Sequence, residues 1–144
     1  MTGIFTGSFD PYTVGHDDIL RRALPLFDRI VIGIGVNGRK SYMQNAEERL
    51  KTINAIYADE PKVEVKTYSD LTIDFARREN ARFIIKGVRS VKDFEYERDQ
   101  ADINRQLSGI ETLLLYADPR YSAVSSSMVR ELIHFGQDVS HFLP

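Results

Sequence analysis

The chain has 144 residues, of which 42% are apolar and 28% are charged, and these values are typical of one globular domain with a buried core. Its formal net charge of −2 gives no overall attraction to nucleic acid or to an anionic membrane, so a site for a polyanion must be a local cluster of basic residues. The absence of cysteine excludes disulfides and thiolate chemistry, and no apolar run suits a membrane span or a signal peptide, so we expect a cytoplasmic protein.

Strand-like and helix-like segments alternate along the whole chain. The predicted strands are residues 1–6, 30–36, 62–68, 82–86 and 111–117, and the predicted helices are 16–27, 46–58, 71–80, 91–107 and 125–135. The apolar runs at 30–36 and 111–117 are typical of buried strands, whereas 62–68 alternates like a strand nearer an edge. This order predicts a single doubly wound α/β domain over residues 1–144, with a parallel sheet flanked by helices.

Residues 7–16 form the most informative segment, and they read GSFDPYTVGH. The segment follows the first predicted strand and brings His16 to the start of a helix that begins near Asp17. Free backbone N–H groups at a helix start attract anions, and His16 can add a donor to a phosphate. Gly7 and Gly15 let the backbone approach a ligand closely. The alternative interpretation is a turn rich in glycine and proline with a capping histidine.

Residues 33–38 (GIGVNG) match the G-x-G-x-x-G pattern of dinucleotide-binding loops. Two of these glycines lie inside a predicted strand, and no helix opens directly after Gly38. We therefore favour the interpretation that small residues let helices pack closely on the strand, and we do not expect NAD to bind here.

Four polar segments follow predicted strands, at 7–16, 37–42, 86–89 and 118–127. Ligands of open α/β sheets bind beyond the carboxyl ends of the strands, near the switch in strand order, so the four segments predict one site. Lys40, Lys86 and Arg89 lie in them. Each residue alone is compatible with a solvated surface charge, but together they predict a phosphate clamp.

Three serines, Ser125, Ser126 and Ser127, open the last predicted helix. One serine suffices to cap a helix, and three with free amides suit a polyphosphate, although a redundant cap explains them equally well. His134 and His141 receive no role. No group of His, Asp and Glu residues has the spacing of metal ligands, so we expect no metal held by the protein itself. No base is placed to activate a serine nucleophile.

The motifs resemble those of the phosphopantetheine adenylyltransferases, a family of the nucleotidyltransferase superfamily with the T/H-x-G-H signature. The matching segments span almost the whole chain in the right order: GSFDPYTVGH at 7–16, EERL at 47–50, DLTIDFAR at 70–77, KGVRSVKDFEYE at 86–97, ADINRQL at 101–107 and YSAVSSS at 121–127. Thr13 stands where cytidylyltransferases carry a first histidine, which favours the phosphopantetheine branch.

The resemblance implies transfer of AMP from ATP to 4′-phosphopantetheine, which gives 3′-dephospho-coenzyme A and pyrophosphate in coenzyme A synthesis. It implies that His16 stabilises the transition state on the ATP phosphates and that Lys40 binds the transferring or substrate phosphate. It also implies that Ser8 contacts both ligands and that Thr72 and Lys86 bind phosphopantetheine. The other implied nucleotide contacts are Phe9, Gly87, Val88, Arg89, Glu97, Tyr121, Ser122, Ala123, Val124, Ser125, Ser126 and Ser127.

The resemblance further implies a five-stranded sheet, assembly as a homohexamer, Mg²⁺ carried in with ATP, and feedback by coenzyme A. Two positions differ from the family pattern. Lys86 stands where arginine is common, so it keeps the charge but loses the planar fork that binds phosphate in a bidentate manner. Ser8 replaces a common threonine and loses only a methyl group.

Two other functions compete with this one. A sister nucleotidyltransferase would use CTP or a nicotinamide nucleotide, and Thr13 together with the segment at 86–97 argues against it. A nucleotide-binding sensor without catalysis would not need the complete set of His16, Lys40 and Arg89.

Overall fold

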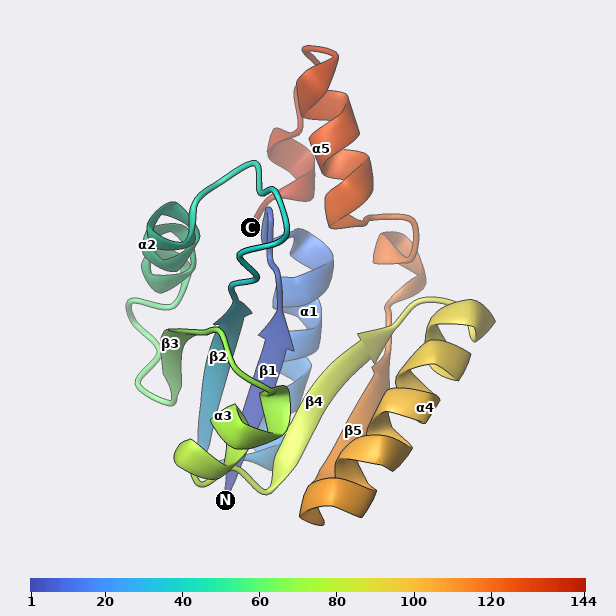
Figure 1. Ribbon diagram of the computed structural model, residues 1–144. Helices are drawn as coiled ribbons and strands as arrows, with labels where there is room; N and C mark the ends of the chain where they lie inside the picture. Colours follow the sequence, from blue (N-terminus) through green and yellow to red (C-terminus); the bar gives the residue numbers. More distant parts are fainter.

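The computed structural model describes residues 1–144, and its centre is a sheet of five parallel strands in the order β3-β2-β1-β4-β5 (Figure 1). The strands are β1 (Thr2–Gly7), β2 (Arg29–Gly35), β3 (Val63–Tyr68), β4 (Phe83–Val88) and β5 (Glu111–Tyr116). The predicted α/β fold with a parallel sheet is therefore confirmed. The chain leaves the central strand β1 toward β2 and β3, and then returns to the other side of β1 to form β4 and β5.

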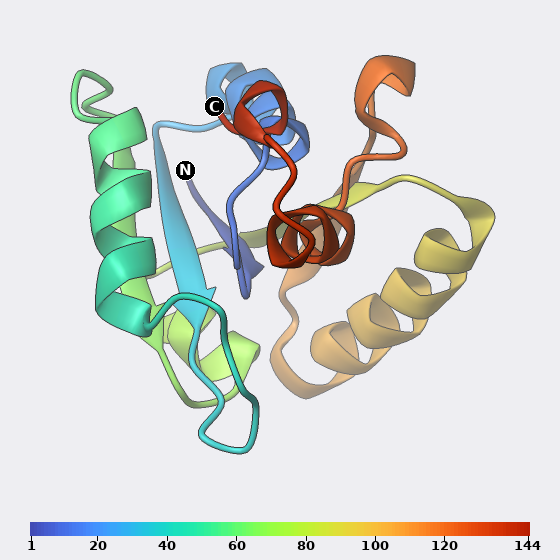
Figure 2. The ribbon, with the colours of Figure 1, turned by 90° about the horizontal axis from the view of Figure 1, so that it is seen from above.

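Helices cover both faces of the sheet (Figures 1 and 2). They are α1 (Val14–Ala23), α2 (Ala46–Ile56), α3 (Thr72–Arg78), α4 (Val91–Ser108) and α5 (Ser126–His134), with short 3-10 turns η1 (Leu24–Leu26), η2 (Pro119–Tyr121) and η3 (Ser140–Phe142). α1 and α2 pack on one face, whereas α3 and α4 lie on the other. α5 stands above the carboxyl ends of the strands (Figure 1). None of the helices combines the length and the apolar composition that a membrane crossing requires.

Strand β2 supplies side chains to both cores of the protein. Ile30, Ile32 and Ile34 join the larger cluster with residues of α1 and α2, and Val31 joins the smaller cluster with Phe75 of α3. These side chains alternate between faces because successive residues of a strand point in opposite directions. The prediction that residues 30–36 are buried on both faces is confirmed, as is the edge position of β3.

Residues 111–117 contain a strand as predicted, but the prediction that this strand is buried is wrong. β5 is an edge strand, the side chains of its middle residues are only half-buried, and Tyr116 is 76% exposed. Its apolar run meets β4 on one side only, and no further strand covers the other edge. An apolar sequence therefore indicated a strand correctly, but its place in the sheet was set by packing.

Among the glycines of residues 33–38, Gly33 is needed for the packing of the sheet. A Cβ atom on Gly33 would lie 2.5 Å from Cε2 of Phe75, so only glycine lets α3 sit this close to β2. Gly38 lies in a turn in which the Lys40 amide donates to the Asn37 carbonyl oxygen at 3.0 Å, and no helix follows until Ala46. The structure thus confirms close packing as the reason for Gly33, whereas a Cβ atom on Gly35 would make only ordinary contacts and one on Gly38 would meet no neighbouring atom within 4 Å.

Candidate active site

Two clefts open side by side at the carboxyl ends of the strands. The first, which we call the histidine cleft, has a volume of about 330 Å³ and lies between β1, β4 and the starts of α1 and α5. The second, the lysine cleft, has a volume of about 890 Å³ and lies between β1, the segment after β2 and the start of α3. Thr6, Gly7 and Lys86 line both clefts, so ligands in the two would meet there.

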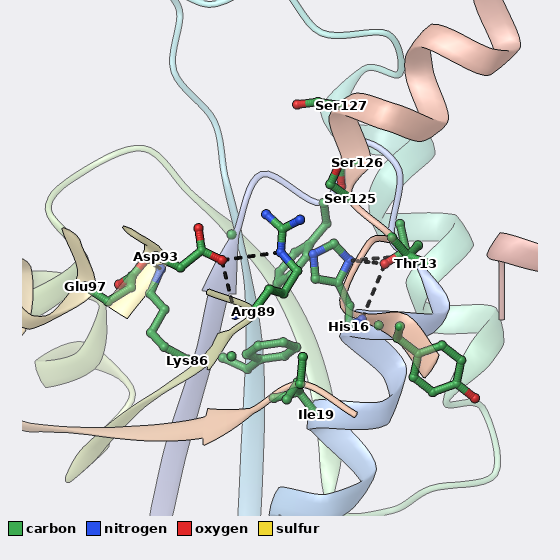
Figure 3. Close-up of a pocket in the computed structure, with 18 of the residues that line it drawn as sticks. Thr13, His16, Ile19, Lys86, Arg89, Asp93, Glu97, Ser125, Ser126 and Ser127 are labelled. Atoms are coloured by element: carbon green, nitrogen blue, oxygen red, sulfur yellow. Dashed lines mark hydrogen bonds and ion pairs between the residues drawn. The ribbon is translucent and has the colours of Figure 1, made fainter. Parts of the chain in front are cut away.

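His16 lies in the first turn of α1 and lines the histidine cleft (Figure 3). The helix begins at Val14, earlier than the sequence indicated, because Thr13 is its N-cap. The Thr13 hydroxyl accepts from the His16 amide at 3.4 Å, and the Thr13 amide donates to Nδ1 of His16 at 2.9 Å. His16 therefore takes part in the helix cap, as the alternative interpretation expected, and it also lines a cleft at the strand ends, while its binding of phosphate stays a prediction. Because Nδ1 is an acceptor, the ring proton is on Nε2, where it is a donor.

Aromatic rings hold the imidazole of His16 in one orientation. Tyr12 stacks on it with centroids 5.2 Å apart, and Phe9 meets it edge-on at 5.0 Å. The hydroxyl groups of Tyr12 and Tyr57 are 2.7 Å apart, and that of Tyr57 donates to Asp17 at 2.6 Å. Burial, and then the charges of the nearby basic side chains, lowers the pKa of His16 to about 4. The ring is therefore neutral at physiological pH.

Phe9 has a φ of 49°, a backbone conformation that is rare for a bulky residue. Its ring is 4% exposed and packs under Gly7, where a Cβ atom would lie 2.9 Å from Cε1 of Phe9. Strain of this kind costs on the order of 1–3 kcal/mol and concentrates at functional sites. Phe9 thus lies at the floor of the histidine cleft and supports His16.

The three predicted basic residues all reach the clefts. Nζ of Lys40 donates to Oγ of Ser8 at 3.1 Å in the lysine cleft. Nζ of Lys86 lies between the clefts, 3.9 Å from a carboxylate oxygen of Glu97. Arg89 faces the histidine cleft, with Nε 3.5 Å from a carboxylate oxygen of Asp93 (Figure 3). The clustering expected from the strand ends is therefore present.

Each of the three serines at the start of α5 has a different partner. Ser125 is the N-cap and accepts from the Met128 amide at 3.1 Å. Ser126 donates to the Pro11 carbonyl oxygen at 2.8 Å, which ties α5 to the loop after β1. All three serines line the histidine cleft, so the start of α5 presents its polar end to that cleft. Ser127 accepts from Nη2 of Arg130 at 3.1 Å, so only Ser125 caps the helix, and binding of a polyphosphate by the three serines stays a prediction.

The remaining predicted contacts divide into those at a cleft and those away from one. Gly87, Glu97, Tyr121 and Val124 line the histidine cleft, and Ser8 and Thr72 line the lysine cleft. Ser122 and Ala123 are exposed and line neither. The Val88 side chain is 3% exposed and belongs to the core.

Several residues at the site were missed by the sequence analysis, among them Asp93, which lines the histidine cleft beside Arg89. Asp10 is buried, and its carboxylate accepts from the amides of Met43 and Gln44 at 2.7 and 2.9 Å, which fixes the end of the segment after β2. Arg49 is buried beneath the lysine cleft. A signal for Arg49 was present, because it lies four residues before Ile53 and so shares the apolar face of α2.

Comparison with known proteins agrees with this geometry. Residues 4–132 match the family model described as cytidylyltransferase-like. The chain has a fold similar to a bifunctional NMN adenylyltransferase/ADP ribose pyrophosphatase from Francisella tularensis, with a TM-score of 0.74 and 15% identity over 99% of this chain and 44% of that chain. The chain is thus a cytidylyltransferase-like protein with the fold of a nucleotidyltransferase.

Relatives in sequence identify the family to which this chain belongs among the nucleotidyltransferases. The chain is 52% identical to the phosphopantetheine adenylyltransferase of Phocaeicola vulgatus, over 98% of this chain and 93% of that one. It is 50% identical to that of Bacteroides fragilis, over 98% and 94%, and 52% identical to that of Porphyromonas gingivalis, over 98% and 92%. The chain belongs to the phosphopantetheine adenylyltransferase family.

We expect His16 to stay neutral, with its proton on Nε2, from about pH 5.5 to pH 8, because burial disfavours the charged ring. Nitrogen-15 NMR of the histidine rings measures this directly. The unfolded chain binds a proton at this ring near its ordinary pKa of about 6.5, whereas the folded protein does so only near 4. His16 should therefore make the protein less stable as the pH falls through that interval. Protonation of His16 in the folded protein near pH 6.5 would contradict this assignment.

Proposed function

We propose that this protein transfers the adenylyl group of ATP to 4′-phosphopantetheine and releases 3′-dephospho-coenzyme A and pyrophosphate. The observation that carries the proposal is the pair of clefts that meet at Gly7 and Lys86, since each has basic groups of its own. Two phosphate-bearing substrates bound in adjoining clefts would bring their reacting phosphates together, which is the main requirement of phosphoryl-type transfer.

The histidine cleft suits ATP. The starts of α1 and α5 both face it, so free backbone N–H groups and the positive ends of two helix dipoles favour a triphosphate. Arg89 adds a fixed positive charge, and Gly87 leaves room for close approach of the nucleotide. Tyr121 and the residues from Val124 to Ser127 would hold the β- and γ-phosphates.

The lysine cleft suits the acceptor. Lys40 and Ser8 meet in it and would bind the 4′-phosphate. A small cavity of about 100 Å³ adjoins this cleft between β4 and α4, and Thr72 and Lys86 line both. The other polar side chains of this cavity include Asn104, and we propose that it receives the amide-bearing pantetheine arm.

The reaction needs no covalent intermediate with the protein. An oxygen of the 4′-phosphate attacks the α-phosphorus of ATP, a new P–O bond forms, and the bond to the β-phosphate oxygen breaks so that pyrophosphate leaves. The protein contributes positioning and stabilisation of negative charge. The Nε2 proton of His16 and the ammonium of Lys40 would donate to oxygens of the transferring group, and Arg89 would hold the departing phosphates.

We propose that Mg²⁺ enters with the triphosphate of ATP. The structure has no group of three His, Asp or Glu side chains placed to hold a metal ion. The two carboxylates of the histidine cleft, Asp93 and Glu97, face Arg89 and Lys86. Triphosphate oxygens and water, which Mg²⁺ prefers, would therefore hold the ion and neutralise part of the developing charge.

We also propose assembly as a homohexamer and feedback by coenzyme A in the cytoplasm, where ATP is supplied. Support for self-association comes from the apolar side chains that α4 and β5 leave exposed, among them Val91, Ile103, Leu107 and Tyr116 at 53 to 76% exposure. Coenzyme A contains the product's adenylyl and pantetheine parts, so it would span both clefts and compete with both substrates.

Purified protein with ATP, Mg²⁺ and 4′-phosphopantetheine should release pyrophosphate and form dephospho-coenzyme A. A panel in which CTP replaces ATP, or nicotinamide mononucleotide replaces the acceptor, tests the sister activities. A clear preference for either replacement would overturn the proposal. Binding of ATP without turnover on any phosphorylated acceptor would instead indicate a sensor.

We expect His16→Ala to lower turnover by about 10²–10³, because it removes one donor aimed at charge that develops in the transition state. The protein should stay folded, bind 4′-phosphopantetheine, and lose about 1 kcal/mol of unfolding free energy with the cap. Steady-state kinetics and denaturant unfolding of the same variant measure both effects. His141→Ala, on the surface beyond α5, is the control.

Two further variants separate the cap of His16 from its catalytic donor. His16→Asn places an acceptor near the Nδ1 position and so keeps the cap, but it loses the Nε2 donor. His16→Gln keeps an amide donor near Nε2, and glutamine at this N3 position also caps a helix. Lower turnover in His16→Asn than in His16→Gln, with the stability of both close to that of the wild type, supports the assignment. Turnover near the wild-type value in His16→Asn would show that the residue is only a cap.

Arg89 and Lys86 should affect different substrates. Arg89 lines the histidine cleft but not the lysine cleft, whereas Lys86 lines both clefts and the cavity for the arm. We expect Arg89→Ala to impair mainly the use of ATP, and Lys86→Ala to raise mainly the KM for 4′-phosphopantetheine. Kinetics with each substrate varied in turn measure this. The opposite pattern would show that the two clefts are assigned the wrong way round.

A further inference from the structure

Arg49 is buried beneath the lysine cleft and forms no ion pair. The residue lies near the start of α2, and only 1% of it is exposed. No carboxylate oxygen lies within ion-pair distance of its guanidinium, and Nη2 has no hydrogen-bond partner. A buried charge without a counter-charge costs free energy unless other groups compensate for it. The contacts of this side chain therefore call for a functional reason.

The guanidinium of Arg49 joins three segments of the backbone. Nη1 donates to the carbonyl oxygen of Ser8 at 2.7 Å and to that of Gly35 at 3.3 Å, so it links the ends of β1 and β2. Nε donates to the carbonyl oxygen of Gln44 at 3.1 Å, just before α2. The guanidinium carbon also lies 4.0 Å from the centre of the Tyr42 ring, within the range of a cation–π contact.

These contacts lead directly to the predicted phosphate ligands. The Tyr42 hydroxyl accepts from the Asn37 amide at 2.8 Å, and the Asn37 carbonyl oxygen accepts from the Lys40 amide at 3.0 Å. The side chain of Lys40 then donates to the hydroxyl of Ser8 at 3.1 Å. Arg49 thus supports both partners of the Lys40–Ser8 contact, one through the Tyr42 ring and the other through a main-chain carbonyl.

Arg49 contacts residues of the lysine cleft and none of the histidine cleft. Ser8, Gly35 and Tyr42 all line the lysine cleft, and none of them lines the histidine cleft. The positive charge of Arg49 is surrounded by carbonyl oxygens and an aromatic ring rather than by water or a carboxylate. In such surroundings a charge acts over a longer distance than in water, and an anion in the lysine cleft would feel it.

We propose that Arg49 is a positioning residue for the acceptor phosphate. It holds Lys40 and Ser8 in the geometry that binds this phosphate, and its charge, which no carboxylate neutralises, strengthens the binding. The inference rests on the proposed function, because that function places a phosphate in the lysine cleft. A residue that merely stabilised α2 would not distinguish a phosphorylated ligand from one without phosphate.

The test compares 4′-phosphopantetheine with pantetheine, which lacks the phosphate. Arg49→Lys keeps the charge but cannot span the carbonyl groups, and Arg49→Met removes the charge at similar length. We expect both variants to bind 4′-phosphopantetheine roughly tenfold to a hundredfold more weakly, the range for a misplaced positioning contact. Affinity for pantetheine and the KM for ATP should change by less than about twofold. Calorimetry of binding and steady-state kinetics measure these quantities.

Two more variants keep the proposal testable if the Arg49 variants do not fold. Tyr42→Phe keeps the ring beneath the guanidinium but loses the hydroxyl that binds the Asn37 amide, so it should weaken the phosphate preference in the same direction. Arg82→Lys is the matched control, because Arg82 is exposed at the amino end of β4 and its side chain has no hydrogen-bond or ion-pair partner. Arg82→Lys should leave the affinities for 4′-phosphopantetheine and for pantetheine unchanged.

The outcomes separate this inference from the proposed function. An unchanged preference for the phosphorylated ligand in the Arg49 and Tyr42 variants, with only a lower Tm, would overturn the role of Arg49 and leave the proposed function intact. Equal affinity of the wild type for both ligands would contradict the placement of the acceptor and, with it, this role for Arg49.

Discussion

All five strands run in the same direction, and the rest of the structure depends on this constraint. Parallel strands end at one edge of the sheet, so every loop that leaves a strand starts at the same side of the molecule. The chain turns to opposite sides of β1 for β2 and for β4, which opens a crevice at the end of β1. The segment from Gly7 to His16 lies in that crevice, with a neighbouring loop on each side. Both clefts follow from this arrangement.

The clefts gather positive charge in a protein that is slightly acidic overall. Lys40 and Arg49 lie at one cleft, Arg89 lies at the other, and Lys86 lies between them. Their carboxylate partners are few and distant, at 3.5 Å for Arg89 and 3.9 Å for Lys86. Helix starts add further donors that have no partner within the helix. This region therefore keeps positive charge that its carboxylates do not neutralise, and in the proposed function the phosphate groups of the two substrates would balance it.

Rigidity at the centre of the site comes from short contacts rather than from the loops themselves. The Thr13 amide sets the tautomer of His16, and Phe9 and Tyr12 set the plane of its ring. Arg49 holds the segment that carries Lys40 in place through its hydrogen bond to the Gln44 carbonyl oxygen and its contact with the Tyr42 ring. A donor that is already in place needs no reorganisation when charge develops on a phosphate, and this is the main advantage that a protein has over water.

The order of strands and helices could be predicted from the sequence, because apolar residues repeat with the period of each element. The sequence also indicated that the segments carrying Lys40 and His16 each follow a strand. In a parallel sheet, that placement is enough to predict that they share an edge. Periodicity does not encode contacts between residues that lie far apart in the sequence, and these contacts depend on the folded chain. The half-exposure of β5 depends on which strand became its neighbour. The burial of Arg49 depends on carbonyl oxygens of Ser8 and Gly35, far away in sequence, and such contacts exist only once the chain is folded.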